Sequence, residues 1–511
     1  MPDHTPRLYL YPTVFITGAV VMVIELLGTR FIAPFYGSSL YVWASLIAVT
    51  MIALALGYYF GGRLADRGNG RGFGVILALA GLLTLVIPLL SRPVLLMTDP
   101  LGLRAGAFIS ALLLFSPGLT LLGMVSPFAI KLATDRLSGV GASAGSIYAV
   151  STVGSVIGTI ALGFFLFPFI GSRAIMIGSG VVLITLALVM AWIQWRQFQH
   201  KPLTLLTTAL AALGVLVALV NVLATRDIDT DPYQVRFEQE SLYGWVRVID
   251  EPKRKFRVLT SDASMIGAAN LNTGKNIMGY QKIVGLLPHL RQTMRTALVI
   301  GQGAGHMAMV LHDQYGMTVD TLELDPAVAT AATDYFGFKP SGEFRLGDAR
   351  YHIRRLKGPY DLIIHDCFTG GTEPVHLLTR ETLLQLRGLL SEQGLLALNF
   401  VAFWQNGENP ALTSVKRTLA SVFPQQQTFI SEPGEAFNDF IFLASRQAIT
   451  LEGSSLPPSG QSWLQQRKVS IPASGALLTD DLNPLEHLQR AKSEHYRNVV
   501  VDWFGTALLL R

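Results

Sequence analysis

Glycines and acidic residues that could bind a nucleoside gather in one part of the chain, between residues 297 and 368. The apolar stretch ALVIGQGAG ends in three alternate glycines, Gly301, Gly303 and Gly305, and the next apolar run ends at Glu323. Glycines let the backbone approach a ligand closely, and an acid at the tip of the following strand can accept hydrogen bonds from both ribose hydroxyls. These residue types, at this spacing, predict a nucleoside site.

Two further acids follow apolar runs in the same region, Asp348 in RLGDAR and Asp366 in YDLIIHDCF. The glycine turn reads G-Q-G-A-G and lacks the G-x-G-x-x-G spacing that is typical of dinucleotide binding. A carboxylate after the third strand can accept a hydrogen bond from an adenine amino group. The pattern therefore favours an adenosyl-sulfonium donor over NAD, and Asp366 is the candidate for contact with the reacting groups.

The elements that carry these residues alternate between strand and helix. Strands are expected at 296–301, 318–324, 343–346, 360–365 and 394–400, with helices at 304–315, 326–336, 350–356 and 379–391. Such a βαβ series forms a parallel, doubly wound Rossmann-like sheet, and ligands bind beyond the carboxyl ends of its strands. Four separate strand ends deliver Gly301, Glu323, Asp348 and Asp366 to that edge. Shorter alternating strands, at 244–250 and 255–259, predict a small β-region before this domain.

The first 225 residues have a different composition, which predicts a multi-pass α-helical membrane domain. About seven apolar runs are long enough to span a bilayer, at 12–33, 40–61, 73–91, 106–130, 144–170, 174–194 and 203–224. This half carries a net charge of +7 and the remainder −2, so the pI of about 9.2 arises from its loops. A nucleic-acid partner is therefore not indicated. Glycines 141, 145, 154 and 158 would let helices pack closely.

The loop charges bear on orientation. Eight Lys and Arg residues lie at the N-terminus and in alternate loops, against four in the others, which favours a cytoplasmic N-terminus. Seven spans would then place the C-terminal domain outside, where adenosyl donors are not normally available. We favour a cytoplasmic catalytic domain on a bacterial inner-membrane protein, because an error of one span is common in hydropathy counting.

With these residues in view, residues 235–490 resemble the spermidine synthases, the polyamine aminopropyltransferases, in a membrane-fused bacterial form. The matching motifs are MGYQKIVGLLPHL, LVIGQGAG, Glu323-Leu-Asp, Gly347-Asp348-Ala349 and DLIIHDCF. The resemblance implies that Tyr280 and Gln281 hold the polyamine acceptor. It also implies that Glu323 binds the ribose, that Asp348 and Ala349 contact the adenine, and that Asp366 is the catalytic aspartate.

The chain departs from the family pattern at three positions. Ala304 stands where the family's glycine turn carries an aspartate for the donor's propylamine, and Trp245 replaces a nucleoside-contacting glutamine. Thr369 replaces the second aspartate of the D-x-x-D-P loop, although it is still expected beside the acceptor. Glu373 in the same loop, or Asp480 and Asp481, could replace the missing acids; a cap or turn role explains the last two equally well.

The resemblance implies a spermidine synthase that transfers the aminopropyl group of decarboxylated S-adenosylmethionine to putrescine. A methyltransferase that uses intact S-adenosylmethionine, and a transporter or sensor with a non-catalytic ligand domain, remain alternatives. The donor is a co-substrate, and neither a permanent cofactor nor a metal is expected, because no metal-ligand spacing occurs. The expected partners are these small molecules and the lipid bilayer, and homo-oligomerisation stays open. The expected divisions are 1–225, 226–290, 291–490 and a C-terminal tail at 491–511.

Overall fold

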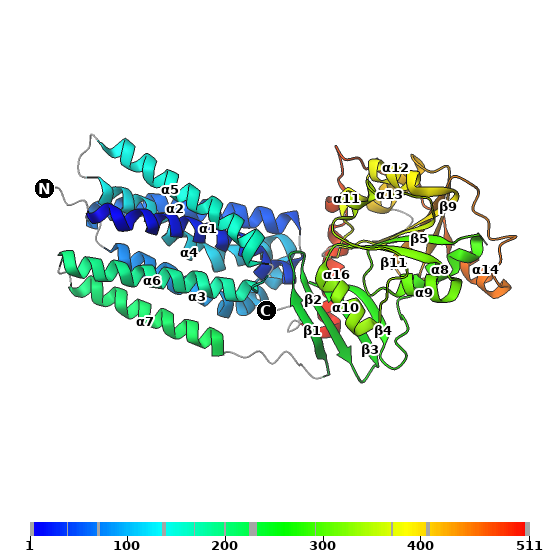
Figure 1. Cartoon of the computed structure of the whole chain (residues 1–511), viewed down its shortest axis with the longest axis horizontal. Coiled ribbons are helices and arrows are strands. Elements are labelled where there is room, and N and C mark those ends of the chain that lie inside the picture. Colours follow the sequence, from blue (N-terminus) through cyan, green and yellow to red (C-terminus); the bar gives the residue numbers. More distant parts are fainter. Residues whose placement is uncertain are drawn as a thin grey trace. The chain divides into compact units, whose positions relative to one another are not determined.

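The chain forms two compact units, one made of helices and one α/β, in a computed structural model (Figure 1). The boundary falls between Asp227 and Ile228, and the α/β unit extends to Gly505. The structure describes residues 5–37, 39–68, 72–134, 139–167, 169–198, 201–223, 232–291, 293–368, 371–404 and 409–505.

Seven long helices make up the described part of the first unit. They are α1 (Thr5–Tyr36), α2 (Leu40–Gly68), α3 (Phe73–Thr98), α4 (Gly102–Ala133), α5 (Val140–Ile160), α6 (Ser172–Phe198) and α7 (Lys201–Leu223). A short 3-10 turn, Asp99–Leu101, separates α3 from α4, and a π-helical turn, Ala161–Leu166, continues α5. Six described segments are long and apolar enough to cross a membrane, and the longest, Phe73–Ala133, contains both α3 and α4.

Two of the four glycines expected at helix contacts lie at one. A Cβ on Gly154 of α5 would come within 2.0 Å of the Phe15 carbonyl oxygen of α1, and one on Gly158 within 2.7 Å of the Ala19 Cα. A Cβ on Gly141 or Gly145 meets no described atom within 4 Å. Of these four glycines, only Gly154 and Gly158 therefore contribute to the close packing of α1 on α5.

The α/β unit begins with a four-stranded antiparallel sheet, in the order β1-β2-β3-β4. Its strands are β1 (Gln234–Glu240), β2 (Trp245–Glu251), β3 (Phe256–Ser261) and β4 (Ser264–Asn270). This sheet is the small β-region that the sequence predicts. A short helix, α8 (Tyr280–Leu286), then leads through a 3-10 turn, Leu287–Leu290, into the main sheet.

The main sheet has eight strands in the order β12-β10-β11-β9-β8-β5-β6-β7. The five predicted strands are β5 (Thr296–Ile300), β6 (Thr318–Glu323), β7 (Phe344–Leu346), β8 (Tyr360–His365) and β9 (Leu390–Phe403), and they run parallel to one another. The other three are β10 (Gln425–Ile430), β11 (Phe437–Ser445) and β12 (Lys468–Val469), and they add antiparallel pairs beyond β9. The expectation of an all-parallel sheet is wrong there. The chain crosses from β9 through α13 to β10, and β11 then follows β10 directly and inserts antiparallel between β10 and β9. Antiparallel strands can be joined by such a short connection, whereas parallel strands need a crossover.

Helices cover both faces of this sheet (Figure 1). Apolar residues of α8, of α9 (His306–Tyr315) and of α14 (Pro458–Gln465) pack on one face. Those of α11 (Ala349–Ile353), α12 (Arg380–Leu389) and α13 (Pro410–Ala420) pack on the other. Because successive side chains of a strand point to opposite faces, Ala297 and Val299 join the first core and Leu298 and Ile300 the second. Burial on both faces holds the carboxyl ends of β5, β6 and β8 in a fixed register.

Four further elements complete the described part of the unit. α10 (Pro326–Phe336) follows β6 and packs against the small sheet. The 3-10 turn Val375–Leu377 precedes α12, and α15 (Leu485–Leu488) precedes α16 (Arg490–Phe504). The residues expected to form a C-terminal tail therefore contain a 15-residue helix.

Candidate functional site

The glycine turn after β5 lies against the loop that carries Asp366. Gly301 has a φ of 90°, and a Cβ there would lie 2.1 Å from the Asp366 carbonyl oxygen. Gly303 has a φ of 55°, and a Cβ there would lie 2.8 Å from the Ile266 carbonyl oxygen. Glycine adopts this left-handed conformation without the steric cost that a side chain brings. The turn therefore brings the end of β5 into direct contact with the end of β8.

The carboxylate of Glu323, at the end of β6, accepts a hydrogen bond from the glycine turn. Oε2 accepts a hydrogen bond from the Gly303 N–H (3.2 Å), and Oε1 accepts from the N–H groups of Leu324 (2.8 Å) and Asp325 (3.0 Å). Burial raises the pKa of Glu323 to about 7, although these hydrogen bonds oppose the shift. The carboxylate lies at the strand tip where a ribose is expected.

Asp348 and Ala349 lie at the next strand end, at the start of α11. Asp348 caps this helix, since its Oδ1 accepts from the Tyr351 N–H (3.0 Å), and its Oδ2 lies 3.2 Å from His376 Nε2. Its side chain is about half exposed. The second oxygen is therefore accessible to a ligand that would displace or join His376.

Asp366 and Tyr280, which lie 86 residues apart in the chain, are in direct contact. The Tyr280 hydroxyl donates a hydrogen bond to Asp366 Oδ2 (2.7 Å), and the Gln281 amide donates to the Tyr280 hydroxyl (3.2 Å). Burial raises the pKa of Asp366 to about 6 against the effect of its hydrogen bonds, and the charge of Glu373 adds to the rise. Burial also raises the pKa of Tyr280, so that its hydroxyl keeps the proton it donates. The expected base and the expected acceptor residues thus form one network.

A second carboxylate belongs to this network. The Asn399 amide nitrogen, on β9, donates to Asp366 Oδ1 (2.9 Å) and also lies 3.4 Å from Asp439 Oδ1, on β11. Burial, and the charge of Asp366, raise the pKa of Asp439 to about 6. The two acids therefore share one amide donor and titrate as a coupled pair.

Glu373 is fully buried and forms an ion pair with Lys492 of α16. Its other oxygen, Oε1, accepts from the Val401 N–H (2.9 Å). Burial raises the pKa of Glu373 and lowers that of Lys492, while the contact between them opposes both shifts. Of the loop residues expected to contact the acceptor, Glu373 is described, and Thr369 lies outside the described residues.

Ala304, which stands where the family's glycine turn carries an aspartate, lies in apolar surroundings. Ala304 is buried in the core between the two sheets, and a Cβ on Gly267 of β4 would lie 2.5 Å from the Ala304 Cβ. Trp245 packs within the small sheet, where its indole N–H donates to Glu238 (2.9 Å) and its ring lies 4.0 Å from the Arg247 guanidinium.

Asp480, one of the two acids considered as replacements, is bound to Arg350. It forms an ion pair with Arg350 of α11, with 2.7 Å between Oδ1 and Nη1, and this contact holds the pKa of its carboxyl below the usual range. Asp480 therefore joins the 480 loop to α11, and its role as a replacement acid stays a prediction. Asp481 is exposed.

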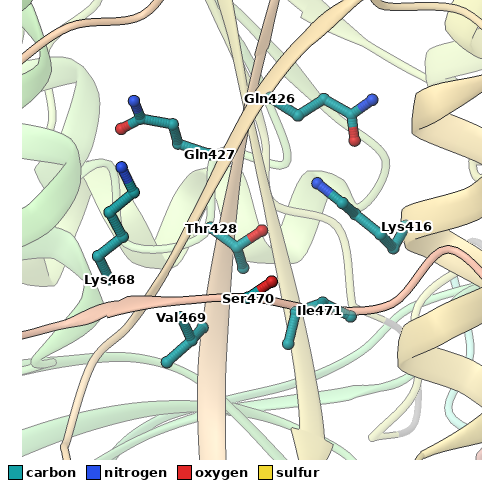
Figure 2. Close-up of a pocket in the computed structure, with 8 residues that line it drawn as sticks. All are labelled: Lys416, Gln426, Gln427, Thr428, Lys468, Val469, Ser470 and Ile471. Carbon is teal, nitrogen blue, oxygen red and sulfur yellow. The ribbon is translucent and has the colours of Figure 1, made fainter.

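A pocket of about 330 Å³ lies elsewhere, at the edge of the sheet formed by β10 and β12 (Figure 2). Thr428 pairs with Val469 and Phe429 with Lys468. Because paired residues share a face, Lys468 extends on the face opposite to Thr428, whereas Lys416 lies on the Thr428 side (Figure 2). The two lysines do not converge, and the pocket contains none of the candidate residues.

No family model matches the chain. Over 212 residues the chain is 32% identical to the polyamine aminopropyltransferase of Vibrio vulnificus, a match that covers 38% of this chain and 69% of that protein. The chain belongs to the polyamine aminopropyltransferase family. The match covers more than two thirds of that relative.

A second family member extends the similarity into the helical unit. Polyamine aminopropyltransferase 2 of Streptomyces coelicolor is 27% identical over 418 residues, which cover 77% of this chain and 74% of that protein. The matched 77% of this chain is longer than the α/β unit alone. A solved structure of a probable spermidine synthase from Corynebacterium glutamicum is 18% identical, with a TM-score of 0.39, and the match covers 51% of this chain and 94% of that one.

Methyltransferases also resemble the chain. An N-terminal histidine N-methyltransferase of Emericella nidulans is 28% identical over 277 residues, which cover 48% of this chain and 46% of that protein. The chain thus spans less than half the length of this relative. The similarity is compatible with a Rossmann-like fold that different transferases share.

Sequence reasoning missed four residues around Asp366 in this family member. They are Asn399, Asp439, Lys492 and Tyr496. Asn399 in LLALNFVAF and Asp439 in FNDFIFLAS are polar residues inside apolar strands, and that signal was available. Lys492 and Tyr496 lie in a polar segment that carries no motif, so only the fold brings them to the site.

Proposed function

We propose that the chain transfers an aminopropyl group from decarboxylated S-adenosylmethionine to a primary amine. Putrescine is the acceptor expected from the sequence, and it would give spermidine and methylthioadenosine. The observation that supports this most is the 2.7 Å hydrogen bond from Tyr280 to Asp366, because it joins the expected acceptor residue to the expected base.

In the proposed reaction the acceptor nitrogen attacks the methylene carbon next to the sulfonium. The carbon–sulfur bond breaks, its electron pair stays on sulfur, and a neutral thioether leaves. Free alkylamines have a pKa near 10 and are protonated at neutral pH, so the enzyme must remove a proton. Asp366 accepts this proton from the nitrogen and later releases it to solvent. Tyr280 and Gln281 orient the nitrogen toward the methylene carbon.

In the same proposal, the donor binds along the ends of β5, β6 and β7. Glu323 accepts from the ribose hydroxyls, in place of the backbone contacts it now makes with Leu324 and Asp325. Gly301, Gly303 and Gly305 allow the backbone to approach the nucleoside, and Asp348 and Ala349 contact the adenine. The donor is a co-substrate that leaves with each turnover.

One observation favours a second candidate, methyl transfer from intact S-adenosylmethionine. Ala304 removes the acid that would bind the propylamine of the decarboxylated donor, and an acid there would also repel the carboxylate of the intact one. For this alternative, the name of the N-terminal histidine N-methyltransferase indicates the acceptor class, an amine or imidazole nitrogen of a peptide N-terminus.

Calorimetric titration of the purified protein with the two donors, side by side, tests the choice. Tighter binding of decarboxylated S-adenosylmethionine, with spermidine formed from putrescine, supports aminopropyl transfer. Tighter binding of the intact donor, with methylated amine as product, replaces it with the second candidate. Binding of neither donor would reject both.

We further propose that α1–α7 insert into the cell membrane, with the α/β unit on the cytoplasmic side. The lengths and composition of the helices support insertion. Cys367 is buried and is the single cysteine of the chain, so Lys357→Cys introduces one exposed thiol. In intact cells, a membrane-impermeant maleimide should leave Lys357→Cys unlabelled until the membrane is permeabilised. Labelling without permeabilisation places the unit outside.

A further inference from the structure

The helix α16 covers the acceptor side of the candidate site. Its His495 ring lies 4.3 Å from the Phe437 ring of β11 and 5.1 Å from the Phe403 ring of β9. A Cβ on Gly371 would lie 3.4 Å from the Tyr496 Cβ. Farther along the helix, Trp503 lies 6.0 Å from Phe256 of the small sheet. Contacts to both sheets therefore fix α16 in place over the loop that carries Glu373.

Lys492 is the residue of α16 that enters the site. It is 3% exposed, its ammonium contacts the Glu373 carboxylate, and Nζ lies 5.1 Å from the Phe368 ring centroid and 4.9 Å from that of Phe400. A carboxylate and the faces of nearby aromatic rings both stabilise an ammonium group. The side chain thus occupies a position that could otherwise bind the cationic end of an acceptor.

Lys492 neutralises one of the buried carboxylates around Asp366. Asp366 and Asp439 both lie next to the Asn399 amide, so these two carboxylates face the same end of an acceptor. Glu373 is the third buried carboxylate of the described residues around Asp366, and its charge acts on the Asp366 carboxyl. Glu373 and Lys492 together carry no net charge, whether or not a proton passes between them.

We propose that Lys492 is a specificity-determining residue, a built-in cation that fills the position where Glu373 would bind the second ammonium of a diamine. The acceptor is then a primary monoamine, whose uncharged remainder lies toward the Phe368 and Phe400 rings. This inference depends on the proposed transfer to an amine and narrows its acceptor class. It predicts that putrescine is a poor acceptor for the natural chain.

The test compares n-butylamine with putrescine, because the two share four carbons and differ in the second amine. With the full-length protein and its preferred donor, kcat/KM for n-butylamine should exceed that for putrescine at least tenfold. Lys492→Met exposes the charge of Glu373 and should reverse this ratio by tenfold or more. Lys492→Arg keeps the charge and should keep the natural ratio.

Two further variants separate charge from structure. Loss of one partner leaves a buried charge unpaired and can destabilise the fold, so the double variant Glu373→Gln/Lys492→Met removes both charges and should regain the preference for n-butylamine. Lys416→Met removes a lysine at the distant sheet edge (Figure 2). It should leave the ratio of kcat/KM for n-butylamine to that for putrescine unchanged. A double variant that keeps the putrescine preference of Lys492→Met contradicts the charge mechanism.

The proposal fails if the natural chain prefers putrescine, or if Lys492→Met leaves the ratio unchanged. An acid outside the buried group, such as the exposed Glu432, would then bind the second ammonium. If no variant transfers to either amine, the proposed function fails, and thermal denaturation still decides the role of Lys492. Putrescine should raise the melting temperature of Lys492→Met more than that of the natural chain, and equal shifts reject the proposal.

Discussion

The donor side and the acceptor side of the candidate site are built in different ways. The donor side uses Gly301, Glu323 and Asp348, which end three neighbouring parallel strands within fifty residues of sequence. The acceptor side joins α8, the ends of β8, β9 and β11, and α16, between residues 280 and 496. The first is a property of one supersecondary motif, and the second exists only in the complete α/β unit.

This difference has a chemical counterpart. Backbone amides and two carboxylates, Glu323 and Asp348, make up the donor side, so substitutions there should act on binding of one ligand. On the acceptor side, four ionisable groups influence one another, namely Asp366, Glu373, Asp439 and Lys492. Substitutions there should change proton transfer and acceptor choice together.

The largest expected effect tests whether proton transfer belongs to the acceptor side alone. Asp366→Asn keeps the shape of the side chain but removes the base, so transfer should fall by about 10²- to 10⁴-fold. Calorimetry should show donor affinity within about twofold of the natural value, because the donor side is intact. Asp334→Asn, at an exposed acid of α10, is the control. Full turnover by Asp366→Asn would transfer the role of base to Asp439.

The converse variant tests the donor side. Glu323→Gln loses the charge expected to accept from the ribose hydroxyls, and hydrogen bonds to charged groups contribute about 1.5–3 kcal/mol. We expect the donor Kd to rise by about 10- to 100-fold, with little change in the KM of the acceptor. The exposed Glu392 provides the matched control, Glu392→Gln. An unchanged donor Kd would mean that the nucleoside binds elsewhere.

The pH profile should report the acceptor side. Asp366 must be ionised to accept a proton, and its pKa is raised to about 6. Below that value kcat/KM, which reports the free enzyme, should lose the contribution of ionised Asp366 about tenfold for each pH unit. Since Asp439 also titrates near 6, the observed limb belongs to the pair. A limb near pH 4 would exclude a buried carboxylate as base.

Loss of the Tyr280 hydroxyl should have a smaller effect. Tyr280→Phe removes the hydrogen bond that lowers the pKa of Asp366, so the acidic limb should move to higher pH. A hydrogen bond to a charged group contributes about 1.5–3 kcal/mol, and we expect transfer to fall by about tenfold at neutral pH. Tyr315→Phe removes a hydroxyl that binds the Gly285 carbonyl away from the site, and it should shift no limb. An identical limb in Tyr280→Phe would contradict the network.

The smallest effect is expected where the sequence suggested an acceptor acid and the structure gives an ion pair. Asp480→Asn breaks a partly exposed contact with Arg350, and such pairs contribute little to stability. Transfer to either amine and the donor Kd should stay within about twofold of their natural values. A selective rise in the KM of the acceptor would return Asp480 to the acceptor side.

The sequence predicts the parallel half of the sheet well because its signals are local. Apolar runs end at a glycine or an acid, and β5, β6, β7 and β8 begin and end within about two residues of expectation. The strand β10 was missed although α13 joins it to β9 in strand–helix–strand order. The strands β11 and β12 were missed because both run antiparallel to β10, and such pairs break the βαβ alternation. The partner of Glu373 was missed for another reason: Lys492 lies 119 residues away in a polar helix, and a lysine in such a helix is usually solvated.

The position of α16 has a consequence for how the protein is made. During synthesis the donor side is complete once β7 and α11 have emerged, well over a hundred residues before Arg490. The acceptor side waits for the last described helix. A chain that stops before Arg490 contains every residue expected to bind the nucleoside and lacks both Lys492 and Tyr496. Incomplete or proteolysed copies would therefore bind the donor without selecting the natural acceptor. Acceptor selection thus requires an intact C-terminal helix.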